Sequence, residues 1–232
     1  MLFVNDNIWN CESFVGIKDL LSSLDDFKDA IKERSYDPST KEYNFFHGVQ
    51  AILQQHALIG YHITRQIDDA SIRTKGLQLL DFNAHWQRIS DVLLDNGINV
   101  DDAEQSFRAV YEGSHGTRQG LVCFFAPIWP KSGLKYGGWD KCARYYGGEI
   151  AENAFYGRPD ILEALGNTGT PYVVKVSLPY AHINSLDRNV AIEIITMILV
   201  NYHFKSNYIP FYTLHFDKAI PSSQIISVER IK

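Results

Sequence analysis

The sequence predicts one α/β domain, of the α+β kind, with a helical extension at its N-terminus. Apolar residues recur at helical spacing before residue 57, whereas short β-prone runs alternate with helical patterns after it. No repeat, low-complexity tract or obvious linker interrupts the chain. We therefore expect residues 1–57 to form the extension and residues 58–232 to form the main domain.

Two helices account for the N-terminal extension. Apolar residues from Ile17 to Ile31 recur at helical spacing, and charged residues fill the opposite face. A loop containing Pro38 follows, and a second helix is expected over residues 42–55.

Strands and helices are predicted along the main domain from apolar β-prone runs, helical periodicity and stop signals. Glycines at positions 76, 97 and 113 follow helical patterns, and Pro159 suits the first turn of another helix. Strands are expected over residues 58–64, 121–126, 172–178, 208–216 and 224–231. Helices are expected over residues 68–75, 83–95, 101–112, 139–146, 160–165 and 185–202.

Composition and charge exclude several classes of protein. The formal net charge of -5 excludes a nucleic-acid-coating protein held by bulk positive charge. The three cysteines are far apart and have no zinc-ligand spacing, and scattered thiols fit a reducing compartment. Neither a secretory signal nor an apolar run long enough for a membrane span is visible. We expect a cytoplasmic protein, or an effector delivered without a cleaved signal peptide.

A short motif follows the start of the first predicted strand. It reads H-x-T-x7-I-x3-G-L and comprises His62, Thr64, Ile72, Gly76 and Leu77. A histidine at a strand end can hydrogen-bond a ribose hydroxyl in a cleft, and the backbone beside it can hold an amide. The simpler interpretation is a His and a Thr that cap an edge strand.

This motif resembles the first motif of the ADP-ribosyltransferase superfamily, especially its diphtheria-toxin-like His-Tyr-Glu branch. The resemblance implies a split mixed sheet, two small sheets with a cleft between them, in which NAD binds bent. His62 would then hold a ribose, and the backbone of Ile63 and Thr64 would hold the nicotinamide amide. Arg65 and Arg118 would contact the diphosphate, because a guanidinium binds phosphate with two donors.

Members of this superfamily stack a tyrosine on the nicotinamide ring, after the strand that corresponds to residues 121–126. Three candidates follow that strand here, namely Tyr136, Tyr145 and Tyr146. Tyr136 lies in a glycine-rich loop, so Tyr145 or Tyr146 is preferred. Packing in the core is the alternative role for each of them.

A carboxylate is needed where the glycosidic bond of NAD breaks, because the transition state resembles an oxocarbenium ion. Glu149 directly follows Gly147 and Gly148, which allow a sharp turn and a close approach to a ligand. In the superfamily the catalytic glutamate lies on a late strand, and this chain departs from that pattern. The carboxylates that remain open as alternatives are Glu152, Glu193 and Glu229.

The function implied by the resemblance is transfer of ADP-ribose from NAD, the substrate, to a protein or nucleic-acid acceptor, without a metal. Such a domain often acts as a bacterial toxin or defence effector, so an antitoxin or immunity partner is expected, and no membrane partner. A local basic groove for a nucleic acid could draw on Arg65, Arg73, Lys75, Arg88, Arg108 and Arg118. The alternatives are a non-catalytic NAD or ADP-ribose binding or interaction module and an NAD-dependent RNA 2′-phosphotransferase.

Overall fold

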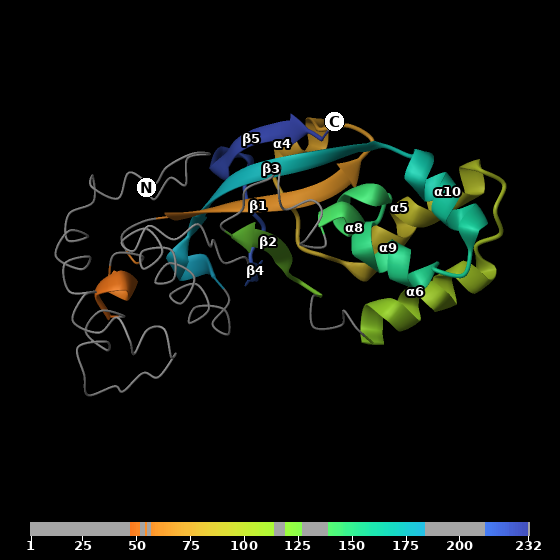
Figure 1. Ribbon diagram of the computed structural model, residues 1–232, viewed down its shortest axis with the longest axis horizontal. Coiled ribbons are helices and arrows are strands. Elements are labelled where there is room, and N and C mark those ends of the chain that lie inside the picture. Colours follow the sequence, from red (N-terminus) through yellow and green to blue (C-terminus); the bar gives the residue numbers. More distant parts are fainter. Residues whose placement is uncertain are drawn as a thin grey trace, which may run out of the picture. The chain divides into compact units, whose positions relative to one another are not determined.

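The protein has a mixed α/β fold, as the sequence predicts (Figure 1). The computed structural model describes residues 47–51, 54, 57–113, 119–126, 139–183 and 212–231. Residues 47–51 are helical, within the second helix predicted for the N-terminal extension. The predicted helices over residues 17–31 and 185–202 lie outside the described residues.

Five described strands are hydrogen-bonded in the order β4-β2-β1-β3-β5, so most neighbours in the sheet are not neighbours in the sequence. Strands β3 and β5 run antiparallel, and Val174 is the partner of Val228. The register shifts between Lys175 and Val176. The strand bounds are Ala57–Gln66 for β1, Val122–Ala126 for β2, Thr170–Pro179 for β3, Tyr212–Phe216 for β4 and Ile225–Arg230 for β5.

The helices agree with the sequence pattern except around residue 146. The helix predicted over residues 139–146 ends at Arg144, and a separate short helix starts at Gly148. The helix bounds are Ala70–Lys75 for α4, Phe82–Asp95 for α5, Asp101–Gly113 for α6, Trp139–Arg144 for α8, Gly148–Ala154 for α9 and Pro159–Asn167 for α10. Short 3-10 turns cover Tyr180–His182 and Ser222–Gln224.

Two compact units share the chain, which passes from one to the other within strands. The first comprises residues 1–60, 125–127 and 177–214, and the second comprises residues 61–124, 128–176 and 215–232. In the first unit, Val49 and Leu178 are among the buried apolar residues. All the helices from α4 to α10 that the structure describes belong to the second unit.

The core of the second unit is aromatic and is built by α5, α6, α9 and α10, which lie together in Figure 1. Phe107 on α6 is fully buried at its centre. Its ring stacks at 6.2 Å on Phe155 and meets the ring of His85 edge-on at 5.2 Å. These contacts fix the side of α5 from which His85 projects.

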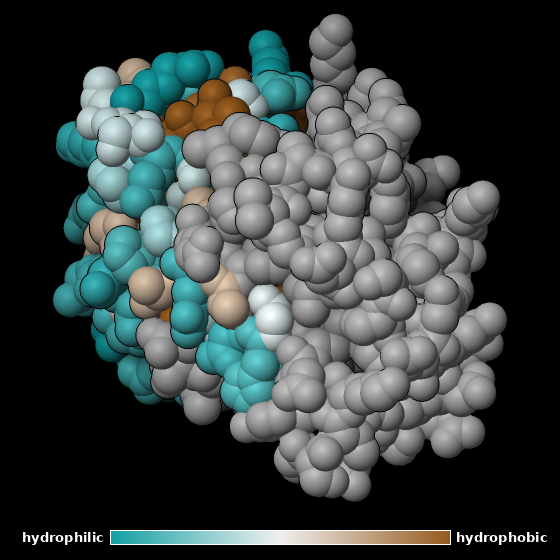
Figure 2. Space-filling view, turned by 90° about the vertical axis from the view of Figure 1, so that its left-hand side faces the viewer, coloured by the Kyte–Doolittle hydropathy of each residue, from teal (hydrophilic) through white to brown (hydrophobic). Residues whose placement is uncertain are grey.

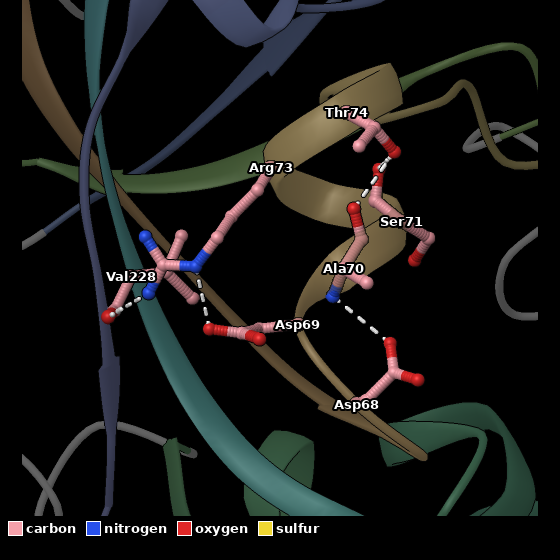
Figure 3. A network of polar contacts seen from close by, with 7 residues as sticks. All are labelled: Asp68, Asp69, Ala70, Ser71, Arg73, Thr74 and Val228. Atoms are coloured by element: carbon pink, nitrogen blue, oxygen red, sulfur yellow. Dashed lines mark hydrogen bonds and ion pairs between the residues drawn. The ribbon is translucent and has the colours of Figure 1, made fainter.

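A small network of hydrogen bonds and an ion pair connects helix α4 to β5 (Figure 3). Arg73 forms an ion pair of 2.7 Å with Asp69 and donates a hydrogen bond of 3.1 Å to the carbonyl of Val228. Immediately after α4, Leu77 and Ile220 form an antiparallel bridge. The segment that follows α4 is therefore held against the C-terminal part of the second unit.

The surface that Figure 2 presents is mainly hydrophilic where its residues are described, with small hydrophobic areas between the hydrophilic residues. Among the described helices, none has the length and apolar character needed to cross a membrane.

Candidate functional site

A cavity of about 760 Å³ lies within the second unit. This volume is in the range of small-molecule and cofactor sites. Its walls are the end of β1, helix α4 with the loop after it, helix α5, the start of β2, and the turn from Tyr146 to Ile150. Segments that are far apart in the sequence thus line one space.

His62 lines this cavity from the middle of β1, not from the strand end that the sequence predicts, because the strand continues to Gln66. Its neighbours Tyr61 and Ile63 are buried, so the alternation of the strand turns His62 to the other face. His62 Nδ1 lies 2.9 Å from the carbonyl oxygen of Cys123, which only accepts hydrogen bonds. Burial lowers the pKa of His62, and this hydrogen bond opposes the shift in part. The neutral ring therefore carries its proton on Nδ1, which leaves Nε2 as an acceptor.

Ile63 and Thr64 line the same cavity. The side chain of Thr64 accepts a hydrogen bond of 2.8 Å from Gln66 Nε2, so its hydroxyl is held by its own strand. A backbone contact to an amide at Ile63 and Thr64 stays a prediction.

Arg65 lines the cavity too, and most of its donors are engaged by backbone carbonyls, so its contact with a diphosphate stays a prediction. Its guanidinium donates to the carbonyls of Ala143 and Arg144, the last two residues of α8, at 3.1 and 3.2 Å. It also donates to the carbonyls of Gly166 and Thr168, at the end of α10, at 2.6 Å each. Four of its five N–H donors are thus used by backbone acceptors that helix ends leave unpaired.

Of the two preferred tyrosines, Tyr146 lines the cavity and Tyr145 is not among the lining residues. Tyr146 is buried, and burial raises the pKa of its hydroxyl. Tyr145 packs at the edge of the aromatic core, with its ring beside Gly166. Tyr146 is also a buried member of the aromatic core, so a ligand contact at Tyr146 stays a prediction.

Glu149 lines the cavity from the first turn of α9. Gly147 precedes this helix with a φ of 94°, a left-handed conformation that favours glycine. A Cβ atom at Gly147 would lie 2.8 Å from the Ile89 side chain, so the turn packs closely on α5. The turn at the two glycines precedes Glu149 on the cavity wall, and a catalytic role for Glu149 stays a prediction.

The other carboxylates considered from the sequence do not line the cavity where they are described. Glu152 forms an ion pair of 2.9 Å with Arg144. Glu229 is exposed on β5 and accepts a hydrogen bond of 3.0 Å from Ser227. Glu193, Arg118 and Tyr136 lie outside the described residues.

Three further basic residues on the cavity wall have no role in NAD binding predicted from the sequence, namely Lys75, His85 and Arg88. His85 and Arg88 are one helical turn apart on α5, and Lys75 ends α4. Within the part of the chain that the structure describes, the ammonium of Lys75 and the terminal nitrogens of Arg88 have no hydrogen-bond or ion-pair partner. In the sequence, Lys75 and Arg88 are candidates only for a basic groove, and His85 is one position of a predicted helix.

No family model, curated protein or solved structure matches this chain. The described residues also contain no group of three or more His, Cys, Asp or Glu side chains arranged to hold a metal ion.

The burial of His85 predicts a dependence of stability on pH. Burial is the main cause that lowers its pKa to about 3, and the charge of Arg88 adds to the effect. An unfolded histidine has a pKa of about 6.5, so the unfolded chain binds more protons as the pH falls. The contribution of His85 to stability is therefore complete above about pH 6.5 and decreases as the pH falls toward the folded value.

Urea unfolding at pH 7 and pH 5 tests this expectation. We expect wild type to lose about 2 kcal/mol of unfolding free energy over this range through His85, and His85→Phe to lose correspondingly less. Equal losses in both proteins would contradict a buried neutral imidazole at this position.

Proposed function

We propose that the chain is an NAD-dependent ADP-ribosyltransferase that releases nicotinamide and transfers ADP-ribose to a macromolecular acceptor. The observation that carries the proposal is that His62, Tyr146 and Glu149 line one cavity. In the sequence, His62, the pair Tyr145 and Tyr146, and Glu149 are candidates for one reaction. The mixed α/β fold is compatible with the proposal.

Each of the three residues has a physical role in this reaction. His62 Nε2 accepts a hydrogen bond from a ribose hydroxyl, since Nδ1 is engaged by the Cys123 carbonyl. The face of Tyr146 stacks on the nicotinamide ring, which is cationic before cleavage. Glu149 stabilises the positive charge that develops on the ribose as the bond to nicotinamide breaks. The residues around the cavity limit the access of water, the competing acceptor.

A binding module without turnover is the second candidate, and one observation favours it. Glu149 lies at the start of a short helix, whereas the superfamily carries its catalytic glutamate on a late strand. The late strand β4 contains no glutamate, and Glu229 on β5 does not line the cavity. An RNA 2′-phosphotransferase is a third candidate, favoured by two cations on the cavity wall, Lys75 and Arg88.

The test is nicotinamide release from NAD by the wild-type chain, alone and with cell lysate as a source of acceptors. We expect release, and we expect Glu149→Gln to lower it by about 10²-fold or more. Glu152→Gln is the matched control, because Glu152 pairs with Arg144 and does not line the cavity. Binding of NAD without release would support the binding module, and removal of a 2′-phosphate from RNA would support the phosphotransferase.

A further inference from the structure

Arg65 connects three chain segments that meet beside the cavity. It lies on β1, three residues after His62, and lines the cavity. Its Nη1 donates to the carbonyls of Ala143 and Arg144 at the end of α8, at 3.1 and 3.2 Å. Its Nη2 and Nε donate to carbonyls at the end of α10, at 2.6 Å each. One side chain on β1 therefore holds the ends of two helices.

The turn that carries Glu149 is attached to both of these helix ends. It follows α8 directly, and α9 begins within it at Gly148. The amide of Tyr146 in the turn donates to the carbonyl of Leu165 on α10 at 3.0 Å. Arg65 thus binds both the helix that leads into the turn and the helix to which the turn is bonded. The position of the turn relative to β1 therefore depends on the guanidinium.

The same end of β1 is in close contact with the segment that follows α10. A Cβ atom at Gly169 would lie 2.5 Å from the carbonyl oxygen of Gln66, the residue after Arg65. The Arg65 side chain therefore extends from a strand end that is itself fixed. Its four acceptors lie on two different helix ends, so together they define one orientation of the planar guanidinium.

We propose that Arg65 is a positioning residue that sets the place of Glu149 relative to His62 in the cavity. His62 and Arg65 share one strand, and the hydrogen bonds to α8 and α10 fix the turn from which Glu149 lines the cavity. A carboxylate acts on a developing charge only at the right distance, and a displacement of about 1 Å can lower a rate about 10²-fold. The effect on the reaction rests on the proposed function, whereas the placement of the turn does not.

Arginine suits this role better than lysine. A guanidinium presents five N–H donors in a rigid plane and can bind acceptors on two helix ends at once, whereas an ammonium presents three donors at one nitrogen. Arg65→Lys therefore keeps the positive charge that a bound anion would need and loses most of the connection between β1 and the two helices. This variant separates a positioning role from a charge contact with the ligand.

Nitrogen relaxation NMR on the full chain without NAD tests the placement of the turn. We expect Arg65→Lys to cause relaxation dispersion, the sign of microsecond-to-millisecond motion, at the amides of Tyr146 and Glu149 and not at that of Phe107 in the aromatic core. Arg158→Lys is the matched control, because Arg158 is an exposed, ion-paired arginine that does not line the cavity. It should leave all three amides as in wild type. Absence of dispersion in the turn of Arg65→Lys, or equal dispersion at Phe107, overturns the positioning role.

Steady-state nicotinamide release tests the consequence for the reaction. We expect Arg65→Lys to lower kcat by about 30-fold or more and to change KM for NAD by less than about threefold, because Glu149 acts on a charge that develops in the transition state. Arg158→Lys should leave both constants unchanged. A higher KM with kcat unchanged in Arg65→Lys overturns the positioning role and indicates a diphosphate contact.

A measurement on wild type decides if Arg65→Lys does not fold. Four acceptors hinder rotation of the Arg65 guanidinium, so we expect its two Nη nitrogens to give separate NMR resonances. A single averaged Nη resonance for Arg65 would show that the guanidinium is not held by the two helix ends and would overturn the positioning role.

The outcomes separate the role of Arg65 from the proposed reaction. A wild-type chain that releases no nicotinamide removes the proposed function, and the NMR result alone then decides whether Arg65 places the turn. Release by wild type, with kcat unchanged in Arg65→Lys, removes the positioning role and leaves the reaction.

Discussion

Replacing Gly76 with alanine is expected to lower the free energy of unfolding by at least about 3 kcal/mol. Gly76 has a φ of 77° and a ψ of -161°, a region of backbone conformation that is almost confined to glycine. A Cβ atom there would lie 1.9 Å from the carbonyl oxygen of Ile220. The substitution therefore strains the backbone and separates the two segments that bridge at Leu77 and Ile220.

Gly97→Ala is the matched control for that measurement by urea denaturation. Gly97 has a similar φ of 70°, but a Cβ atom there would meet nothing within 4 Å. It should cost about 1 kcal/mol, the strain of the left-handed backbone alone. Equal losses in the two variants would contradict the close approach at Gly76.

Truncating Arg65 is expected to have a comparable effect. Arg65→Met removes four hydrogen bonds to carbonyls at the ends of α8 and α10, and a positive charge that these helix ends favour. Because acceptors near the ends of two helices lose a charged donor, we expect a loss of about 3–5 kcal/mol in urea unfolding. The loss should appear whether or not NAD is present.

Arg73→Met serves as its control. Arg73 donates to one backbone carbonyl, whereas Arg65 donates to four. The side chain of Arg73 is 54% exposed, and its ion pair with Asp69 lies at the surface. We expect it to cost about 1 kcal/mol. A loss of unfolding free energy in Arg65→Met no larger than that in Arg73→Met would contradict the structural role. Much weaker stabilisation of Arg65→Met than of wild type by NAD would support a contact between Arg65 and the diphosphate.

Much of the fold of the second unit could be predicted because its signals are local. Packing explains three positions of the H-x-T-x7-I-x3-G-L motif. Ile72 and Leu77 are buried, and the close approach of Ile220 requires a glycine at position 76. Those positions serve the fold whatever the chain does. His62 is the member of the motif that lines the cavity with a ring nitrogen available as an acceptor. Its Nδ1 is engaged by the Cys123 carbonyl, and its Nε2 is the remaining acceptor.

The roles of Arg65 and His85 could not be predicted, because they depend on partners that are distant in sequence. The acceptors of Arg65 are 78 to 103 residues away. In the sequence His85 is only one position of an amphipathic helix. In the structure it lies beside Gly147 and lines the cavity. In the sequence, Glu149 is distinguished from other glutamates only by the two glycines that precede it. Tyr146 is distinguished from Tyr145 only in the structure, where Tyr146 lines the cavity.

A double-mutant cycle in nicotinamide release tests most directly whether His62 and Glu149 act on one NAD molecule in one cavity. We expect His62→Ala and Glu149→Gln each to lower the rate by about 10²-fold, and the double variant to be little slower than the slower single one. Losses that simply multiply would place the residues in separate sites, and a wild-type chain that releases no nicotinamide would contradict the account altogether.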